Sequence, residues 1–317
     1  MRTGVSYMGH HRPRYIHVDL TEMKELGCDD VLLAAQEVDF IHFTGKIQFV
    51  PKIAKDIGLR PIAIFWGVLN LFGGGRSSQF LLENPEGFQK AKDGSHRAAG
   101  CFVNPVCVNQ IQKMIDRIAE LGFEGYFIDE PTPLKNCYCK ACQAQFKEWY
   151  KADLLFSKDD SLIEKFRKRC VVNYVLKISE YCQKNHPKLE TFCCVMPRDK
   201  AVWGEISEIN GLTNIGTDIY WVNDKNPVEE MIPMVREIAA LCKEKKKKHH
   251  EWLQCWDVRK GQEDRILGQG QILVNEKPDG LYIWAWQGQI GTYETCDDPN
   301  LAWEKAARIL RMAKGLN

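Results

Sequence analysis

Residues 125–131 read GYFIDEP, a short apolar run that stops at two adjacent carboxylates and a proline. A brief apolar segment bounded by turn residues predicts a buried strand, and the amphipathic helical patterns on both sides of it predict a parallel sheet. Because burying a carboxylate without a partner costs free energy, Asp129 and Glu130 at the end of this strand indicate a functional site. A helix N-cap or a salt bridge would explain the same two residues.

The alternation of a short apolar run and a longer amphipathic one repeats along the whole chain. Most of the apolar runs follow a turn that contains Gly, Pro or Asn, as expected for strands. Eight such units close a barrel, whereas an open dinucleotide-binding sheet would need fewer strands and a GxGxxG turn after the first. We therefore predict an α/β fold, a (β/α)₈ TIM barrel that forms a single domain over residues 1–317. The predicted strands are Gly4–Met8, Asp30–Ala35, Arg60–Trp66, Gly125–Asp129, Glu190–Met196, Asn214–Trp221, Glu251–Trp256 and Gly280–Trp286.

The composition argues against several kinds of partner. With 43 basic and 42 acidic residues the net charge is +1, so no global field favours nucleic acid or an anionic membrane surface. No apolar run is long enough to span a bilayer, and the opening residues do not resemble a signal peptide. Thirteen cysteines in such a chain predict reduced thiols or metal ligation, and hence a cytoplasmic protein.

Two connections are much longer than the others, residues 67–104 after the third predicted strand and residues 131–187 after the fourth. In a TIM barrel the loops that follow the strands build the active site, so extra length there predicts substrate loops or a lid. The first connection contains FGGGRSS at residues 72–78, which lacks the lysine of a phosphate-binding loop. We interpret it as a flexible active-site loop.

Polar and aromatic residues lie at the ends of nearly all the predicted strands. A packed core needs no such pattern, whereas a pocket that stacks sugar rings on aromatic side chains and hydrogen-bonds sugar hydroxyls does. We therefore predict that these residues converge at one end of the barrel and bind a saccharide. They are Tyr7, His10, Gln36, Glu37, Trp66, Tyr220, Trp221, Gln254, Trp256, Trp284, Trp286 and Gln287.

The sequence IDEP at residues 128–131 resembles the fourth strand of clan A glycoside hydrolases, which typically ends in Asn-Glu-Pro. The resemblance implies that Glu130 is the general acid/base of a glycosidase. It also implies that Asp129 belongs to the catalytic site, in the place where Asn is usual.

Two residues compete for the second carboxylate of such a site. Retaining clan A enzymes carry a nucleophilic Glu at the end of the seventh strand, and this chain has Gln254 near that place. Since an amide cannot act as the nucleophile, Asp257 just beyond it and Asp218 at the end of the sixth strand are the alternatives. His249 and His250 are expected before the seventh strand, at the opposite end of the barrel, in a structural role.

A second motif, CYCKAC at residues 137–142 with CFVNP upstream, resembles the β-galactosidases of glycoside hydrolase family 42 and their uncharacterised relatives. In these proteins one cysteine before the fourth strand joins a CxCxxC motif after it to bind a structural zinc. The resemblance implies zinc held by Cys137, Cys139 and Cys142, with Cys101 or Cys107 as the fourth ligand. Sites of four thiolates are closed, so this metal would brace the loop without taking part in the chemistry.

These patterns predict a glycosidase that cleaves O-glycosidic bonds with paired carboxylates and needs no organic cofactor. Its expected partner is a saccharide or glycoside, without nucleic acid or membrane, and a homo-oligomer is compatible with the sequence. Two alternatives stay open. A barrel that has lost its nucleophile at Gln254 would bind saccharide without turnover. A metal-dependent isomerase or lyase on the same fold is the other, although no HxH or HExxH spacing supports a catalytic metal.

Overall fold

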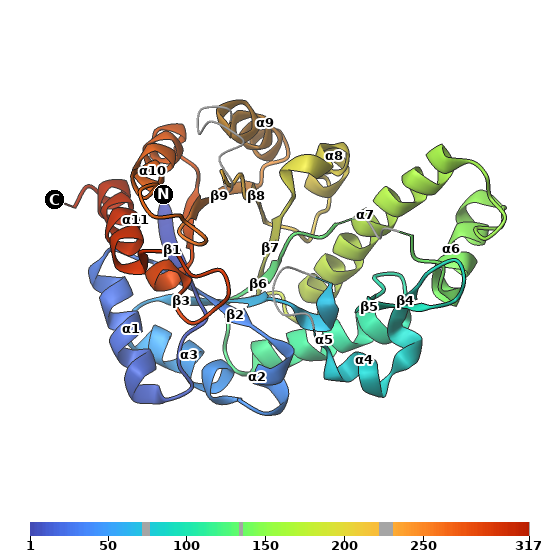
Figure 1. Cartoon of the computed structure of the whole chain (residues 1–317), viewed down its shortest axis with the longest axis horizontal. Coiled ribbons are helices and arrows are strands. Elements are labelled where there is room, and N and C mark those ends of the chain that lie inside the picture. The colour runs from blue at the N-terminus through green and yellow to red at the C-terminus, as the bar shows by residue number, and fades with distance from the viewer. Residues whose placement is uncertain (72–76, 133–135, 222–230, 317) are drawn as a thin grey trace.

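The computed structural model describes residues 1–71, 77–132, 136–221 and 231–316. Within these residues, eight parallel strands close into a barrel in the order β1-β10-β9-β8-β7-β6-β3-β2 (Figure 1). The predicted TIM barrel is thereby confirmed. The barrel strands are β1 (Arg2–Tyr7), β2 (Asp30–Ala35), β3 (Arg60–Phe65), β6 (Gly125–Ile128), β7 (Glu190–Cys194), β8 (Asn214–Thr217), β9 (Lys248–Gln254) and β10 (Gly280–Trp284).

All the predicted strands are present, but every strand except β2 ends before the last residue that its apolar pattern predicts. The difference is largest for β8, which ends at Thr217 rather than Trp221. The apolar and aromatic pattern continues past the last ladder hydrogen bond because the residues there line cavities or pack beneath them. At the other end, β9 begins at Lys248, so the prediction that His249 and His250 precede it is wrong. Both lie in the ladder with β8. The lysine run at residues 245–248 before them is typical of the end of a helix, so the sequence pattern places the start of the strand too late.

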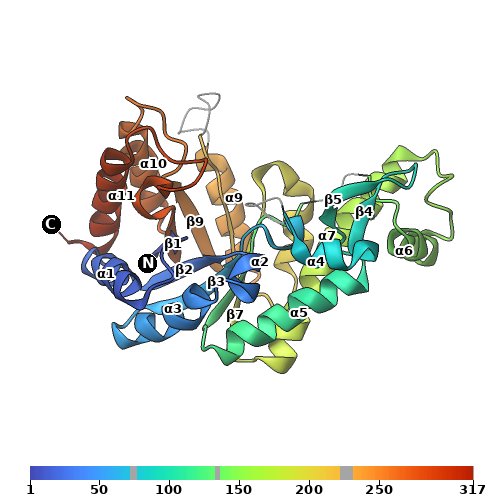
Figure 2. The same cartoon turned by 60° about the horizontal axis from the view of Figure 1, so that its bottom comes forward.

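Helices cover the outside of the barrel in both views (Figures 1 and 2). An Asn-Pro pair predicts a helix start, because Asn can cap the helix and Pro suits its first turn. At the pair Asn104-Pro105 this is what α5 shows: the Asn104 side chain accepts a hydrogen bond from Val106 N at 3.0 Å. A second pair, at residues 226–227, predicts a helix whose residues before Met231 lie outside the described part of the chain. The helices are α1 (Pro13–Glu25), α2 (Glu37–Ile41), α3 (Gly45–Asp56), α5 (Pro105–Glu120), α7 (Asp160–Asn185), α8 (Trp203–Ser207), α9 (Met231–Glu244), α10 (Asp264–Glu276) and α11 (Pro299–Lys314).

The two long connections leave the barrel together and form a projecting arm, which lies to the right in Figures 1 and 2. The arm consists of α4 (Gln79–Glu83), the antiparallel hairpin of β4 (Phe88–Lys90) and β5 (His96–Gly100), α6 (Lys140–Tyr150) and the adjoining part of α7. The backbone N–H of Tyr138 donates to the carbonyl of Lys90 at 2.7 Å and ties the two connections to each other. The predicted extra length is therefore largely regular structure. Of the loop predicted at residues 72–78, residues 72–76 lie outside the described residues.

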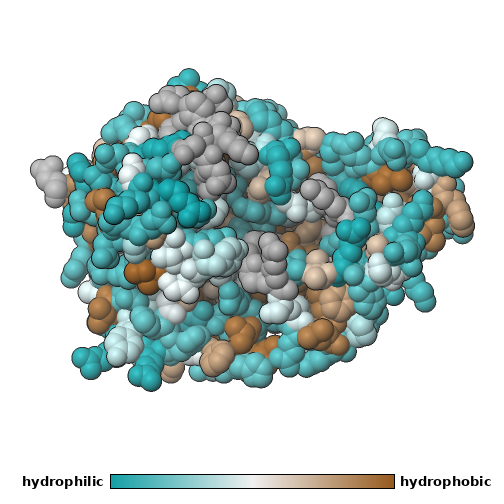
Figure 3. Space-filling view, viewed as in Figure 1, coloured by the Kyte–Doolittle hydropathy of each residue, from teal (hydrophilic) through white to brown (hydrophobic). Residues whose placement is uncertain are grey.

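Alternate residues of the strands fill the barrel interior, because successive side chains of a strand point to opposite faces. The interior cluster is aromatic and aliphatic, and it contains Ile62, Ile64, Trp66, Phe127, Phe192, Trp252, Tyr282 and Trp284. The outward faces of the strands pack against the helices in a second cluster. The face drawn in Figure 3 is mostly hydrophilic, with apolar residues scattered over it. Among the described helices, none is both long and apolar enough to cross a membrane.

The amino ends of the strands carry a buried ionic network. Asp30 is fully buried and receives Arg60 through two bonds, from Nε to Oδ1 at 2.8 Å and from Nη2 to Oδ2 at 2.9 Å. Arg2 also donates to this carboxylate, and so does the hydroxyl of Tyr282, at 3.1 Å. Arg60 contacts Glu190 at the start of β7 as well. The buried carboxylate at this end of the barrel is therefore matched by cations and hydrogen-bond donors.

Candidate active site

A cavity of about 150 Å³ opens at the carboxyl ends of the strands. Because the carboxyl ends of parallel strands meet at one end of a barrel, residues far apart in the sequence converge there. The predicted site residues that line the cavity are Trp66, Asp129, Glu130, Asp218, Tyr220, Trp256 and Trp284. Cys194, Trp252 and Glu294 line it as well.

The adjacent carboxylates of Asp129 and Glu130 both reach this cavity because the backbone turns between them. Phe127 points into the barrel, so the two-residue alternation of the strand brings Asp129 inside as well. Glu130 would then point outward, but its backbone lies in the left-handed region with φ 38°, which brings its side chain into the same cavity. This conformation costs a residue with a Cβ roughly 1–2 kcal/mol, and such strain is concentrated at functional sites.

The carboxylates of Asp129, Glu130 and Asp218 meet in this cavity, and no described residue that lines it is a cation. Burial raises the pKa of Asp218 well above its usual range, and the charge of Glu130 and a hydrogen bond with it raise that pKa further. Burial raises the pKa of Asp129 as well, and the Glu130 charge adds to the effect. Such a cluster favours retention of a proton, which is the property required for general acid catalysis.

Aromatic rings form most of the remaining wall of the cavity. The centroids of Trp66 and Trp284 are 5.9 Å apart, and those of Tyr220 and Trp256 are 5.4 Å apart. Within the described part of the chain, Trp256 Nε1 and Asp218 Oδ1 have no hydrogen-bond partner. Rings available for stacking, together with a spare donor and a spare acceptor, suit a sugar better than a purely apolar ligand.

A larger cavity of about 520 Å³ adjoins the first, and Trp66 lines both. Asp19 and Lys46 contribute charges of both signs to its wall. The predicted residues that line the larger cavity, besides Trp66, are His10, Gln36, Trp286 and Gln287.

Gln254, at the place where a nucleophile was expected, lines neither cavity. It is fully buried: its Oε1 accepts from the backbone N–H of Trp221 at 3.1 Å, and its Nε2 donates to the carbonyl of Trp256 at 3.1 Å. Trp221 is buried as well and donates from Nε1 to Gln269 at 2.9 Å. Gln254 and Trp221 thus hold together the segments that follow β8 and β9.

Tyr7 and Glu37, two further predicted site residues, have partners within the protein. Tyr7 is wholly buried, and its hydroxyl donates to Asp19 Oδ2 at 2.7 Å, on the inner side of the larger cavity. Glu37 accepts from the hydroxyl of Ser78 at 2.8 Å and from the backbone N–H of Phe80 at 2.7 Å. Glu37 therefore anchors the connection after β3 to the start of α2.

The structure places Glu294 in the carboxylate cavity, although the sequence did not single it out, and leaves Asp257 outside that cavity. Gln289 Nε2 donates to the Glu294 carboxylate at 2.8 Å, and the carbonyl of Glu294 accepts from the N–H of Asp257 at 2.7 Å. The Asp257 carboxylate pairs with Arg259 at 2.9 Å and lines neither of the two cavities. The only sequence signal for Glu294 was its place in the loop after the eighth strand, on the side where barrel enzymes build their sites.

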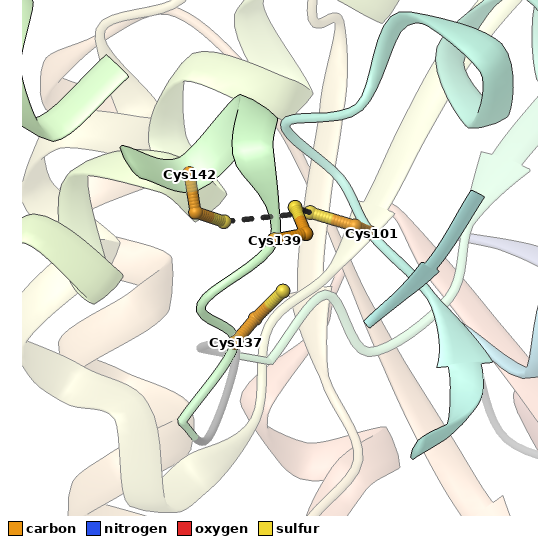
Figure 4. Close-up of side chains that lie close together, drawn as sticks. All are labelled: Cys101, Cys137, Cys139 and Cys142. Atoms are coloured by element: carbon orange, nitrogen blue, oxygen red, sulfur yellow. Dashed lines mark hydrogen bonds between the residues drawn. The ribbon is translucent and has the colours of Figure 1, made fainter. Parts of the chain in front are cut away.

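Four buried cysteines meet where the arm joins the barrel. The side chains of Cys101, Cys137, Cys139 and Cys142 point toward one another (Figure 4), and their sulfurs all lie within 4.8 Å of each other. The Sγ atom of Cys101 is 3.5 Å from that of Cys142 and 3.6 Å from that of Cys139. Cys107, the alternative fourth ligand, donates its thiol to a backbone carbonyl at 3.2 Å and lies outside the cluster.

The cluster has the geometry of a tetrahedral metal site. A zinc ion about 2.3 Å from each sulfur would place the sulfurs about 3.8 Å apart, close to the separations between these thiols. Hydrogen bonds among the thiols lower the pKa of Cys137 well below its usual range and raise that of Cys101. The four residues can therefore hold a metal ion such as zinc, at a distance from the carboxylate cavity, which none of them lines.

No protein-family model matches this chain, and no curated protein matches it either. Several solved structures are similar. The β-galactosidase of the haloarchaeon Halorubrum lacusprofundi aligns with 100% of this chain and 58% of its own, with a TM-score of 0.77 and 15% identity. A family 42 β-galactosidase of G. stearothermophilus aligns with 99% of this chain and 56% of its own, with a TM-score of 0.74 and 14% identity. For the endo-1,4-β-mannanase of Rhizomucor miehei the shares are 99% and 95%, the TM-score is 0.66 and the identity is 11%.

At these identities the likeness concerns the fold. The resemblance to clan A glycoside hydrolases and to the barrel of the family 42 β-galactosidases is confirmed at that level. The chain spans somewhat more than half the length of the two β-galactosidases. It shares with them a closed barrel of eight parallel strands.

Proposed function

We propose that the protein is a glycoside hydrolase that cleaves O-glycosidic bonds with paired carboxylates, with Glu130 as the general acid/base. The observation that carries this proposal is the cavity at the barrel mouth, where carboxylates from several strand ends meet among tryptophan rings. Hydrolysis of a glycosidic bond requires a proton donor for the leaving oxygen and a second carboxylate on the other side of the sugar. The shared fold with two β-galactosidases and a mannanase supports a saccharide substrate.

Glu294 is the better candidate for the second carboxylate. Paired carboxylates of glycosidases are about 5–5.5 Å apart in retaining enzymes and roughly 6.5–9.5 Å apart in inverting ones. Asp218 is in hydrogen-bonding contact with Glu130, which is too close for a sugar to lie between them. In the barrel order β10 lies opposite β6, so the loop that carries Glu294 arises across the mouth from Glu130.

In this mechanism Glu130 passes a proton to the glycosidic oxygen as the bond to the anomeric carbon breaks. Asp129 and Asp218 position the Glu130 side chain and disfavour a further negative charge beside it. The role of Glu294 depends on its distance from Glu130. At the shorter separation it attacks the anomeric carbon, and a water molecule activated by Glu130 then hydrolyses the glycosyl-enzyme with net retention. At the longer separation Glu294 activates a water molecule that attacks directly, which gives inversion. The rings of Trp66 and Trp284 stack on the sugar and exclude water.

We propose further that the four-cysteine cluster binds zinc in a structural role. A closed site of four thiolates leaves no position for substrate, and the cysteines join the hairpin of the arm to the connection after β6. A cytoplasmic location fits the thirteen cysteines, because reducing compartments keep thiols free and available for metal.

The proposal is tested with a series of aryl glycosides that differ in leaving group, hydrolysed by the natural protein and by Glu130→Gln. With a poor leaving group the variant should lose roughly 10²–10⁴-fold in turnover, because the departing oxygen then requires a proton. The loss should shrink for activated leaving groups. Glu124→Gln is the matched control, since Glu124 is an exposed residue that pairs with Lys55 near the other end of β6. Equal rates of Glu130→Gln and the natural protein on the poor leaving group would refute the mechanism.

One observation favours a second function, saccharide binding without turnover. Gln254 ends β9, where clan A enzymes carry the nucleophile, and both ends of its amide bond to backbone groups. An amide cannot act as the nucleophile. A pure binding protein would be inert toward every glycoside, and Glu130→Gln would leave its affinity for saccharides nearly unchanged.

A further inference from the structure

A third cavity, of about 720 Å³, lies between the barrel mouth and the arm. It is built by the segments that follow β3, β6 and β7. These three strands are neighbours in the barrel, and Trp66, Glu130 and Cys194 at their carboxyl ends line the carboxylate cavity. Thr132, only two residues beyond Glu130, lines it. A chain of sugars bound at Glu130 would therefore have this cavity beside it.

Arg167 of α7 is the unusual residue of this cavity. It lines the cavity and is only 5% exposed, and within the described residues none of its guanidinium nitrogens has a hydrogen-bond partner. Its charge is flanked by the rings of Tyr138 and Phe166, with the guanidinium carbon 5.3 Å and 5.1 Å from their centroids. Ring contacts attract the cation but leave its N–H donors unused, and burying a charge without a partner is costly.

The other charged residues described in the wall of the cavity do not form a hydrogen bond with Arg167. Lys168 forms an ion pair with Glu164 at 2.6 Å, so these two residues neutralise each other. Asp160 and Asp199 also line the cavity, but neither supplies a hydrogen bond to the guanidinium of Arg167. Arg198 is exposed on the cavity wall and adds a second guanidinium.

We propose that this cavity is an anion-binding subsite, in which Arg167 and Arg198 receive a carboxylate or sulfate group carried by the saccharide. The proposal rests on the proposed function and narrows it, since it assigns the substrate to the acidic glycans. The planar fork of a guanidinium matches the oxygens of a carboxylate or sulfate, and such charge-assisted bonds are stronger than neutral ones. A bound anion would supply the partner that the buried Arg167 lacks.

A competing role for Arg167 is to balance the charge of a metal held by the nearby cysteines, because Tyr138 stands between Cys137 and Cys139 in the sequence. Arg167 makes no hydrogen bond to any of the four sulfurs, which argues against that role. Metal content must nevertheless be measured on each variant, since it distinguishes the two roles.

The experiment measures binding by calorimetry on the intact protein, with glucuronate, galacturonate and galactose 6-sulfate as probes and glucose and galactose as neutral counterparts. At least one acidic sugar should bind roughly tenfold or more tightly than its neutral counterpart. Arg167→Met should abolish that preference, and Arg167→Lys should retain part of it. Arg169→Met is the matched control, because Arg169 lies on the same helix, exposed and stacked over Trp149 at 4.1 Å, and its loss should change nothing.

The probes also identify the anion, since the uronates test a carboxylate and galactose 6-sulfate tests a sulfate. Equal affinity for acidic and neutral sugars in the natural protein would overturn the proposal. It would also be overturned if Arg167→Met kept the preference while losing bound metal, which would assign Arg167 to the cluster. Because the experiment measures binding and not turnover, the two proposals can fail separately. A protein that prefers acidic sugars but hydrolyses no glycoside would support the anion-binding subsite and refute the proposed hydrolysis.

Discussion

Buried carboxylates occur at both ends of the barrel, but their surroundings are opposite. At the amino ends of the strands, Asp30 is fully buried and hydrogen-bonded by Arg60 and Tyr282. At the mouth, Asp129 and Asp218 lie beside another carboxylate, and no described residue that lines their cavity is a cation. The carboxylate is thus paired with cations at the amino ends of the strands, whereas at the carboxyl ends the carboxylates have no cation among the described residues of their cavity.

The difference separates the charges that stabilise the fold from the charges for which we propose a role in catalysis. A matched buried pair holds its elements together, because removing either partner leaves the other charge buried and alone. An unmatched carboxylate destabilises the folded state, and a protein retains it where a perturbed pKa is useful. The substitutions below should therefore change activity at one end and stability at the other.

The largest effect is expected from Glu294→Gln. If Glu294 is the second carboxylate, turnover of aryl glycosides should fall by roughly 10²–10⁴-fold while the melting temperature changes little. Asp257→Asn is the matched control: Asp257 bonds to the backbone of Glu294 but pairs with Arg259 outside the cavity. A loss of turnover in Asp257→Asn with full activity in Glu294→Gln would reverse the assignment.

Arg60→Met at the opposite end should lower stability rather than activity. It removes one of the two cations that bond to the buried Asp30, and the remaining cation, Arg2, is more exposed. We expect a loss of roughly 1–3 kcal/mol in the free energy of unfolding, less than for a buried charge left with no partner. Urea unfolding measures the change. Arg236→Met removes an exposed guanidinium that pairs with Glu276, and it should change the free energy of unfolding much less, because solvent screens an exposed ion pair. If the two variants were equally stable, the network at the amino ends would not have the role assigned to it.

The cysteine cluster provides a third region, which should contribute stability without chemistry. Cys139→Ser should abolish metal binding, measured by elemental analysis, and should cost more than the roughly 1 kcal/mol typical of a point substitution. Turnover on small aryl glycosides at 25 °C should change little. Cys107→Ser keeps a donor for the same carbonyl and should leave metal content unchanged. Full metal content in Cys139→Ser would contradict the ligand set.

The smallest effect is a stabilisation by Asp218→Asn that depends on pH. A carboxyl whose pKa is raised in the folded state contributes stability below its unfolded pKa, near 4, and loses that contribution as pH rises through the folded value. Removing the carboxyl should therefore stabilise the protein at pH 8, on the order of 1 kcal/mol, and have less effect at pH 4. Melting curves at the two pH values test this sign, which is opposite to that expected for Arg60→Met. Destabilisation at pH 8 would show that Asp218 is compensated after all.

The barrel could be predicted from the sequence because its signals are local. Each strand is an apolar run between turn residues, and α5 begins at an Asn-Pro signal that the structure shows in full. Glu130 could be found for the same reason, since it directly follows a strand. The ends of the strands were less accurate, because residues that line the mouth continue the apolar pattern beyond the ladder.

The composition of the site could be predicted only in part, because it depends on where side chains point. Gln254 ends β9, two residues before the end of the predicted strand, and its amide turns to the backbone instead of the cavity. Glu37 has the position of a site residue and serves as an anchor for the next connection. Glu294 lies in a loop without a periodic pattern, so only the fold brings it to the mouth.

If the cysteine cluster binds zinc as proposed, its position would link the supply of metal to the structure of the arm. Cys101 is 38 residues from Cys139 and 41 from Cys142, and α5 and β6 lie between them. An ion bound there clamps the ends of one βα repeat together, and its stabilising effect grows with the logarithm of the free metal concentration. The arm would therefore open locally at low zinc while the rest of the barrel stayed closed. Since the cavity of Arg167 is built partly from the arm, the selectivity of the protein would then follow the zinc content of its surroundings.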